Sequence, residues 1–233
     1  MNNIEFFFNI EVDNINISIF DEETKKIIFN KKIELSISYD DIKVFIDKLN
    51  NILKKLIIEI EGKVNQQVNR INLIIEDPRT SKINACIKKN FDKSIISKDQ
   101  IEYLVQDLKQ QILNEGANTK VNHIIINEFI VDGQKVNNPP IDKVCNDLII
   151  DLQFICLRKD LVTSLENLFK NHQIEFSSVL CAYYTKSFFN QQFNSIFETA
   201  VALKKGHNPN EVVIIPKKPV KMGFFEKLFH IFS

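Results

Sequence analysis

The spacing of apolar residues changes between residues 4 and 56, and this change constrains the fold more than any other feature of the sequence. Three short apolar runs, IEFFFNI, INISIF and IELSIS, lie between residues 4 and 38 and are separated by polar stretches, which predicts an antiparallel meander of strands. From Ile42 to Leu56 the apolar residues recur at i, i+3 and i+4, which predicts a helix with one face against that sheet. Ser38 and Asp41 form a capping-box pattern at its start. The sequence therefore predicts an α+β fold.

The same alternation of strand and helix patterns continues to Gly206. The predicted elements are strands at 71–75 and 83–87, a helix at 98–114, long strands within 121–133 and 145–157, a helix at 159–172, a strand at 174–180 and helical sequence from 183 to 206. Ser97 supplies an N-cap for the second helix, and Gly116 ends it. The proline-containing turn EDPRTS, before residue 83, marks a subdomain boundary.

Composition excludes several classes of protein. The chain has 233 residues, of which 44% are hydrophobic, so it can bury a core of its own. Thirty basic and thirty acidic side chains give a net charge of zero, which excludes a protein that attracts nucleic acid through its overall charge. No apolar run reaches the length of about 18 residues that a spanning helix needs. The N-terminus lacks the basic start of a leader peptide. Any membrane contact is therefore predicted to be peripheral.

The side chains that carry most enzyme chemistry do not form a convincing cluster. His123 and Glu128 are five residues apart on a predicted strand, hence on opposite faces, and His172 lies at a helix end. Surface or capping roles are the simpler interpretation of these histidines. Asp147 and Asp151 share one face of a strand, a pattern more typical of solvated charges than of an acid–base pair. We predict no catalytic site.

The four cysteines also lack the spacing of a functional site. They are Cys86, Cys145, Cys156 and Cys181. Because no CxxC pair or neighbouring histidine accompanies them, we expect reduced thiols that serve as small apolar fillers, and no metal site.

The last 27 residues differ in character from the rest. Residues 207–222 are rich in proline and lysine, which predicts a flexible linker. In GFFEKLFHIFS, residues 223–233, the apolar side chains occupy one half of a helical wheel. These are Phe224, Phe225, Leu228, Phe229, Ile231 and Phe232. With Lys221 and Lys227 beside them, they are typical of a helix that lies in a membrane interface. A helix of this pattern also suits a groove on a protein.

A long run in the middle of the chain resembles the bacterial cell-division protein family FtsA. The resemblance rests on VNHIIINEFIVDGQKVNNP and the strand, helix and strand that follow it. The matching positions are His123, Glu128, Phe129, Ile130, Val131, Asp132, Gly133, Gln134, Asn138 and Pro139. SIFETAVALKKG, residues 195–206, and the terminal GFFEKLFHIFS are similar to segments of the same family, in the same order.

The resemblance implies a partial actin-like (ribonuclease-H-like) subdomain carrying an inserted strand-helix-strand-strand module. The implied organisation is a partial actin-like subdomain at 1–82, the inserted module at 83–178, helices completing the subdomain at 179–206, a flexible linker at 207–222 and a membrane-targeting helix at 223–233. Residues 128–134, EFIVDGQ, are expected either to shape the module, with a turn at Gly133, or to form its protein-docking motif.

The chain departs from the family in the parts that bind nucleotide. The family places a Gly followed by Ser or Thr in the first hairpin, whereas this chain has Glu11, Val12, Asp13 and Asn14 there, and Asp13 is expected to repel phosphate. Its five glycines leave no second phosphate loop, and most of the second half of the actin-like body is missing. We therefore expect that ATP binding is lost, with no cofactor and no enzymatic activity.

Three functions are compatible with these features. The first is an FtsA-like, non-catalytic tether at the septum, peripheral on the cytoplasmic face of the inner membrane. Its expected partners are FtsN-like division proteins and further copies of itself. FtsZ is kept as an open alternative partner, because the subdomain that usually docks it is absent. The second is a soluble assembly adaptor whose terminal helix docks on a protein. The third is a residual ATPase of the actin-like class.

Overall fold

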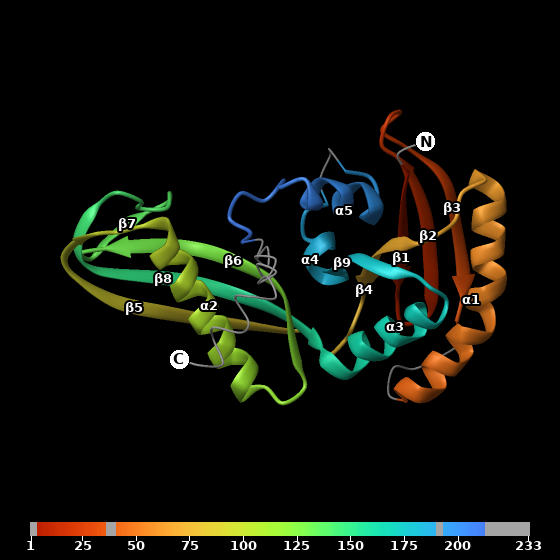
Figure 1. Ribbon diagram of the computed structural model, residues 1–233, viewed down its shortest axis with the longest axis horizontal. Coiled ribbons are helices and arrows are strands. Elements are labelled where there is room, and N and C mark those ends of the chain that lie inside the picture. Colours follow the sequence, from red (N-terminus) through yellow and green to blue (C-terminus); the bar gives the residue numbers. More distant parts are fainter. Residues whose placement is uncertain (1–3, 36–40, 190–192, 213–233) are drawn as a thin grey trace, which may run out of the picture.

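Two β-sheets stand side by side in an elongated molecule (Figure 1). The computed structural model describes residues 4–35, 41–189 and 193–212. The first sheet has the strand order β3-β2-β1-β4-β9 and the second the order β5-β8-β6-β7. In chain order the elements are β1 (Ile4–Ile10), β2 (Asn14–Asp21), β3 (Lys26–Glu34), α1 (Ile42–Val64), β4 (Arg70–Ile75), β5 (Ser81–Ile95), α2 (Lys98–Glu115), β6 (Thr119–Val131), β7 (Gln134–Val136), β8 (Val144–Arg158), α3 (Lys159–Asn171), β9 (Glu175–Cys181), α4 (Ala182–Lys186) and α5 (Ile196–Lys204).

The first sheet is covered by helices on both faces. Strands β1, β2 and β3 form an antiparallel meander, and β4 and β9 join β1 in parallel. Neighbouring residues of a strand point to opposite faces. Phe8 of β1 contacts Phe169 of α3 with ring centroids 5.4 Å apart, while Phe7 contacts Phe197 of α5 at 6.2 Å. Because β1 is buried on both faces from Phe6 onward, three consecutive phenylalanines, Phe6, Phe7 and Phe8, occupy its centre.

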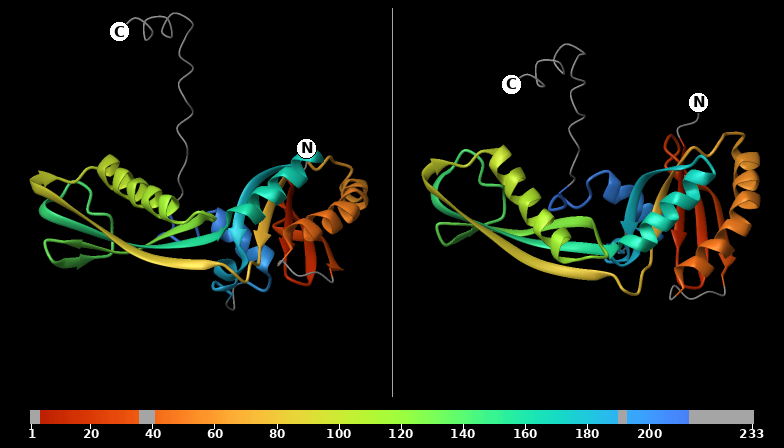
Figure 2. Two further views of the ribbon diagram at one scale, coloured as in Figure 1. Left: turned by 90° about the horizontal axis from the view of Figure 1, so that it is seen from below. Right: turned by 60° about the horizontal axis from the view of Figure 1, so that its bottom comes forward.

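Within the described residues, one helix, α2, covers one face of the second sheet (Figure 2). The side chains beneath this helix form a separate core that includes Phe129, Leu148, Ile150 and Phe154. On β8 these buried residues alternate with half-exposed ones that face away from α2. The chain passes to this unit after β4 and returns from it at Arg158, so the unit is an insertion between β4 and α3.

The predicted fold class, α+β with a partial actin-like subdomain that carries an inserted module, is confirmed. Three antiparallel strands followed by two parallel ones in the order 3-2-1-4-9 form the ribonuclease-H-like sheet. The second helix agrees closely with its sequence pattern. Ser97 accepts a hydrogen bond from Gln100 N, and the Gln100 side chain accepts one from Ser97 N, which completes a capping box. The five apolar residues of its stripe are all buried.

The predicted position of the third strand is wrong. The sequence predicts it at IELSIS, residues 33–38, but β3 spans Lys26–Glu34 and runs through the polar NKK stretch. As the edge of its sheet it has one exposed face, so exposed and half-buried residues alternate along it instead of forming an apolar run. Ser38 lies outside the described residues, and Asp41 caps α1 by accepting from Val44 N at 3.1 Å.

The structure also corrects the predicted boundaries of the inserted module. The predicted module, 83–178, includes α3 and β9, but β9 pairs with β4 in the first sheet and α3 packs on β1 of that sheet through Phe169. The second sheet with α2 takes up only 81–158. Local strand and helix patterns do not reveal which sheet a strand joins, because the pairing partner lies far away in the sequence.

Gly116 ends α2 for a different reason from the one predicted. Its φ is −97°, so it does not adopt the left-handed conformation that favours glycine at a helix end. A β-carbon at this position would lie 2.8 Å from the β-carbon of Thr119. Glycine is needed here for close approach of the chain.

Candidate functional site

Polar residues gather where the parallel strands of the first sheet end. Glu11 follows β1, Glu76 and Asp77 follow β4, and Lys186 ends the short helix after β9. Ligands in open sheets bind outside the carboxyl ends of parallel strands. This edge, which includes the first hairpin, is therefore the natural candidate for a binding site.

Glu11 occupies the hairpin position where the FtsA resemblance implies a phosphate loop. Its carboxylate accepts from Asn9 Nδ2 at 2.9 Å and Asn16 Nδ2 at 3.2 Å, and Lys186 Nζ lies 3.5 Å away. Its backbone N–H donates to Asn14 O at 2.9 Å. The chain's own carboxylate thus takes up two side-chain amide donors and lies beside an ammonium group at this hairpin, and it places a negative charge there.

Lys186 links the ends of two strands. Its ammonium lies 3.1 Å from Glu76 Oε1, in addition to its pair with Glu11. Burial acts to lower the pKa of Lys186, but the hydrogen bond from Lys186 to Glu76 and the charges of Glu76 and Glu11 outweigh it, so the pKa is raised. The lysine remains charged and is committed to two carboxylates.

A buried ion pair lies at the junction of the two units. Arg158 Nε donates to Asp77 Oδ2 at 2.9 Å, and the Asp77 side chain is fully buried. Asp77 also accepts from Arg79 N at 3.0 Å and so shapes the turn into β5. Asp77 lies on the chain that leaves the first unit, and Arg158 lies where the chain returns. The pair therefore joins the two backbone segments that connect the first unit to the second.

His123 is the buried centre of a second network at this junction. Cys181 N donates to His123 Nε2 at 2.9 Å, so Nδ1 carries the proton and donates to Glu211 Oε1 at 2.6 Å. Tyr184 OH donates to Glu211 Oε2 at 2.7 Å, and Asn208 Nδ2 donates to Tyr184 OH at 2.9 Å. Burial raises the pKa of Tyr184 well above its ordinary value, and Glu211 raises it further. His123 was predicted to be a surface or capping residue, and that prediction is wrong.

Residues 207–212, which we call the exit strap, pair with β6. Val212 N donates to Ile124 O at 2.8 Å, and Ile126 N donates to Asn210 O at 2.9 Å. Together with Glu211 these bonds fix the segment on the second sheet. The predicted flexible linker, 207–222, therefore begins too early. Its proline and polar residues resemble a linker, and its partners lie more than eighty residues earlier in the chain, so a local pattern does not reveal them.

The predicted docking motif, residues 128–134, forms the end of β6 and the start of β7. Phe129 is buried and Val131 packs against the same core, as the predicted one-sided alternation requires. Asp132 and Gly133 have φ of 48° and 81°, typical of a two-residue hairpin turn. Asp132 Oδ1 accepts from Asn146 N and Asp147 N at 2.9 and 2.8 Å. Much of the motif thus shapes the hairpin.

The open face of the second sheet carries the other predicted acidic residues. Asp147 pairs with Lys88 at 3.0 Å, Asp151 accepts from Asn127 at 3.1 Å, and Glu128 pairs with Lys135 at 2.9 Å. These charges are paired on a partly solvated surface. The structure therefore does not bring them together with His123.

Three of the cysteines are buried, as expected of apolar fillers, but Cys86 is exposed. Partial desolvation of the Cys86 thiol, followed by the charge of Asp151, raises its pKa. In the part of the chain that the structure describes, no group of three or more His, Cys, Asp or Glu side chains is placed to hold a metal ion. None of the helices in residues 4–35, 41–189 and 193–212 is long and apolar enough to span a membrane.

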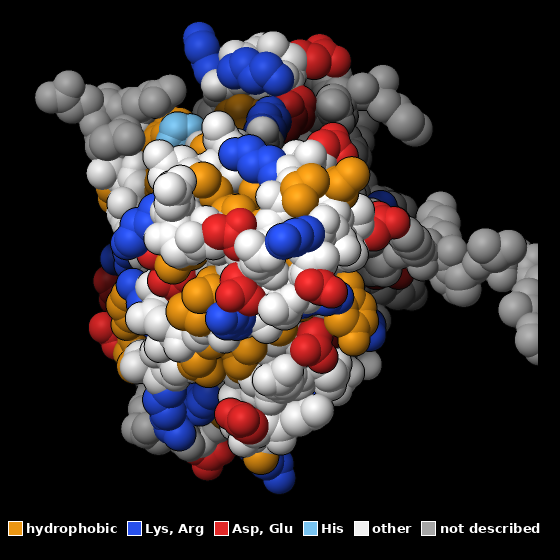
Figure 3. Space-filling view, turned by 90° about the vertical axis from the view of Figure 1, so that its left-hand side faces the viewer, with side chains coloured by type: hydrophobic (Ala, Val, Ile, Leu, Met, Phe, Trp, Pro, Cys, Tyr) orange, Lys and Arg blue, Asp and Glu red, His pale blue; other side chains and the backbone are white. Residues whose placement is uncertain are grey.

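The tip of the second unit exposes large apolar side chains. Ile95 and Val144 are paired at the end of β5 and β8, and their exposed fractions are 58% and 60%. Ile141, in the neighbouring loop, is 40% exposed. Figure 3 shows this end of the molecule, where apolar side chains lie among lysines and acidic residues. A clustered apolar surface of this kind is typical of a contact with another protein.

Comparisons with known proteins match folds only. No protein-family model and no curated protein match the chain. The cytoplasmic domain of EpsL, an inner-membrane component of the type II secretion system of Vibrio cholerae, aligns at 9% identity and a TM-score of 0.41, covering 78% of this chain and 59% of that one. A PilM–PilN type IV pilus biogenesis complex aligns at 5% identity and 0.48, covering 78% and 48%.

A protein of unknown function from Bacteroides thetaiotaomicron, described as having an actin-like ATPase fold, aligns at 15% identity and a TM-score of 0.32. The alignment covers 80% of this chain and 57% of that one. The chain thus spans between 48% and 59% of the length of these three solved structures.

Proposed function

We propose that the protein is a non-catalytic, membrane-tethered scaffold of the FtsA-like type. In this proposal residues 223–233 attach it to the cytoplasmic face of the bacterial inner membrane, and the inserted unit recruits division proteins at the septum. The observation that carries the non-catalytic part is the Glu11 carboxylate, which is tied to Asn9, Asn16 and Lys186 at the first hairpin. An ATP phosphate at this place would meet a negative charge and donors that are already used.

The first prediction concerns nucleotide binding. In titration calorimetry with Mg·ATP, we expect no binding in the micromolar range for the full chain. Glu11→Gly removes the carboxylate from the hairpin, and Glu23→Gly, in the exposed turn after β2, is the matched control. Because the second half of the actin-like body is missing, we expect that neither variant gains micromolar affinity. Micromolar binding by the unmodified chain would support the residual ATPase instead.

The proposed anchor is the amphipathic segment 223–233, which lies outside the described residues, as do all of the predicted membrane-binding side chains. Six large apolar side chains on one helix face contribute about 1.5–3 kcal/mol each when fully buried, and a surface helix buries them in part. Lysines near an anionic surface add about 1 kcal/mol each before screening. The sum is sufficient for reversible membrane binding.

The second prediction is a flotation experiment with vesicles that contain anionic lipid. The full chain is expected to float with the vesicles, and a chain that ends at Lys221 is expected to remain in the dense fraction. Leu228→Asp, on the apolar face, is expected to reduce flotation at least tenfold. His230→Asp adds the same charge to the polar face and is expected to have a much smaller effect. Equal flotation of the full and shortened chains would rule out the anchor.

The apolar tip of the second unit supports the recruiting part of the proposal. It lies on the inserted unit, far from the junction, and presents Ile95, Val144 and Ile141. If the terminal segment binds a protein partner and is indifferent to lipid charge, the soluble adaptor replaces the tether, and the flotation experiment separates the two. FtsN-like proteins and further copies of the chain are the proposed partners.

A further inference from the structure

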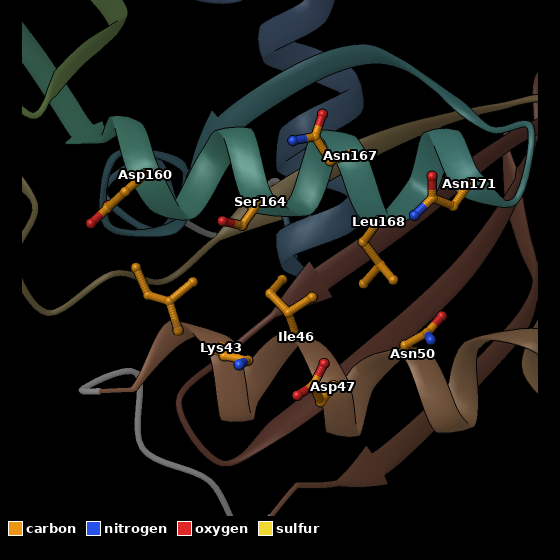
Figure 4. Close-up of a pocket in the computed structure, with 10 residues that line it drawn as sticks. Lys43, Ile46, Asp47, Asn50, Asp160, Ser164, Asn167, Leu168 and Asn171 are labelled. Atoms are coloured by element: carbon orange, nitrogen blue, oxygen red, sulfur yellow. The ribbon is translucent and has the colours of Figure 1, made fainter.

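A groove of about 620 Å³ lies between α1 and α3 on the first unit (Figure 4). Ile42 and Ile46 of α1 and Leu168 of α3 supply its apolar surface, and Ile46 and Leu168 point toward each other across it. At one end His172 bonds to Asn50, with 3.0 Å between His172 Nε2 and Asn50 Oδ1. The volume falls in the range of pockets that enclose a small ligand or a few large side chains.

The groove leaves apolar surface of α1 uncovered. The main stripe of this helix, which includes Phe45 and Leu49, is buried against the sheet. Ile42 and Ile46 lie at the edge of that stripe and remain half-exposed, because α3 does not close over them. Apolar surface that faces a groove is stabilised by an occupant that covers it.

The rim of the groove is acidic on balance. Among the described residues that line it, Asp47 and Asp160 are acidic and Lys43 is the one cation, and both aspartates are exposed. The remaining polar lining side chains are the neutral Asn50, Ser164, Asn167 and Asn171. An occupant with aromatic or aliphatic side chains and flanking positive charges would complement this surface.

The chain's own terminal segment has this chemistry. Residues 213–233 contain the six apolar residues of the predicted helix face, together with Lys217, Lys218, Lys221 and Lys227 against the single acidic Glu226. Apolar side chains of this segment would cover Ile42 and Ile46, and its lysines would complement Asp47 and Asp160.

The segment is also long enough to reach the groove. It follows Val212, which is bonded to Ile124 of β6 and packs against the core under α2. Asn118 lies six residues before Ile124 in the chain. It accepts hydrogen bonds from the backbone N–H groups of Lys159 and Asp160 at the start of α3. At about 3.3 Å per strand residue, Ile124 and Asn118 are roughly 20 Å apart. Residues 213–222 span up to about 33 Å when extended, and α2 and α3 lie on the same side of the molecule (Figure 2).

We propose that the α1–α3 groove is an intramolecular dock for residues 223–233, so that the apolar helix face is shielded in the groove in the absence of lipid and released to bind the membrane. This inference rests on the proposed membrane tether and adds regulation to it. The dock and the membrane compete for the same apolar face. The protein would therefore bind membranes less tightly than its terminal segment alone allows.

The first test compares amide hydrogen exchange in the full chain and in a chain that ends at Lys221, both without lipid. Exchange in α1 residues 42–50 and α3 residues 164–171 is expected to be at least threefold faster in the shortened chain. Adding anionic vesicles to the full chain is expected to raise its exchange to the same rate. Identical exchange in the two lipid-free chains would overturn the dock, whatever the vesicles do.

The second test uses variants of the groove. Ile46→Asp places a charge on its apolar surface, and Asp47→Lys reverses the charge of its rim. Both are expected to increase flotation of the full chain by threefold or more. Val44→Asp, on the exposed side of α1, and Glu102→Lys, on the exposed face of α2, are the matched controls and are expected to leave flotation unchanged.

The outcomes of the two tests are separable. If the full chain never floats but the exchange difference is present, the tether fails and the dock stands. If the chain floats and neither the exchange nor the groove variants have an effect, the dock fails and the tether stands. An exchange difference that disappears on dilution indicates docking between two copies and also overturns the intramolecular dock.

Discussion

Replacement of Asp77 with alanine is expected to lower the free energy of unfolding by about 3–5 kcal/mol, because it leaves Arg158 as an unpaired charge at the junction of the two units. The Asp77 side chain is fully buried and Arg158 is 8% exposed. Asp77 also accepts from Arg79 N, so the same change loosens the turn that leads into the second unit. In urea-induced unfolding followed by circular dichroism, the midpoint is expected to fall by about 1–2 M.

Two controls make this prediction specific. Arg70 and Glu175 form an exposed pair at 3.7 Å, and Arg70→Ala is expected to cost less than about 1 kcal/mol. A double variant, Asp77→Leu with Arg158→Met, removes both charges and is expected to regain much of the lost stability. If Asp77→Ala costs no more than Arg70→Ala, the buried pair does not hold the junction together.

The second large effect is expected at the exit strap. Glu211→Ala removes the acceptor of both His123 Nδ1 and Tyr184 OH, and each buried donor left unsatisfied costs about 1–3 kcal/mol. Glu211 lies between Asn210 and Val212, the two residues whose backbone bonds hold the strap on β6. Hydrogen exchange at the amides of Ile126 and Val212 is therefore expected to become at least tenfold faster.

The control for the strap is Glu102→Ala, at an exposed position on α2, which is expected to leave both amides unchanged. Flotation of the Glu211→Ala variant is expected to persist, because residues 223–233 are intact. Unchanged exchange at Val212 would mean that the Glu211 network does not hold the strap on β6.

The elements that the sequence predicts best are those whose stability is local. The helix α2 has its cap, its capping box and its buried stripe within eighteen residues, so its pattern is complete without the rest of the chain. The hairpin at Asp132 and Gly133 is equally local. In contrast, β3 was placed wrongly, because an edge strand with one exposed face carries polar residues such as Asn30 and Lys32 on that face, where a central strand would carry apolar residues.

The candidate site was predicted only in part. The sequence shows acidic residues in the first hairpin and predicts that Asp13 repels phosphate there. The structure instead ties up the carboxylate of Glu11 with neighbouring donors. Its partners, Asn9, Asn16 and Lys186, are not distinctive by themselves in a chain rich in asparagine and lysine. The roles of His123 and Glu211 were missed because the two residues are separated by 88 positions, and no local pattern connects them.

Sequence alone determined the α+β class, the periods of most helices and strands, the absent glycine loops and the amphipathic character of residues 223–233. Each of these follows from the order of neighbouring residues, because backbone conformation and facial burial repeat over a few positions. Tertiary structure alone decided that α3 and β9 belong to the first sheet, that Asp77 meets Arg158, and that residues 207–212 are strapped to β6. These are contacts between distant parts of the chain, and only the packing of the two units brings them within bonding distance.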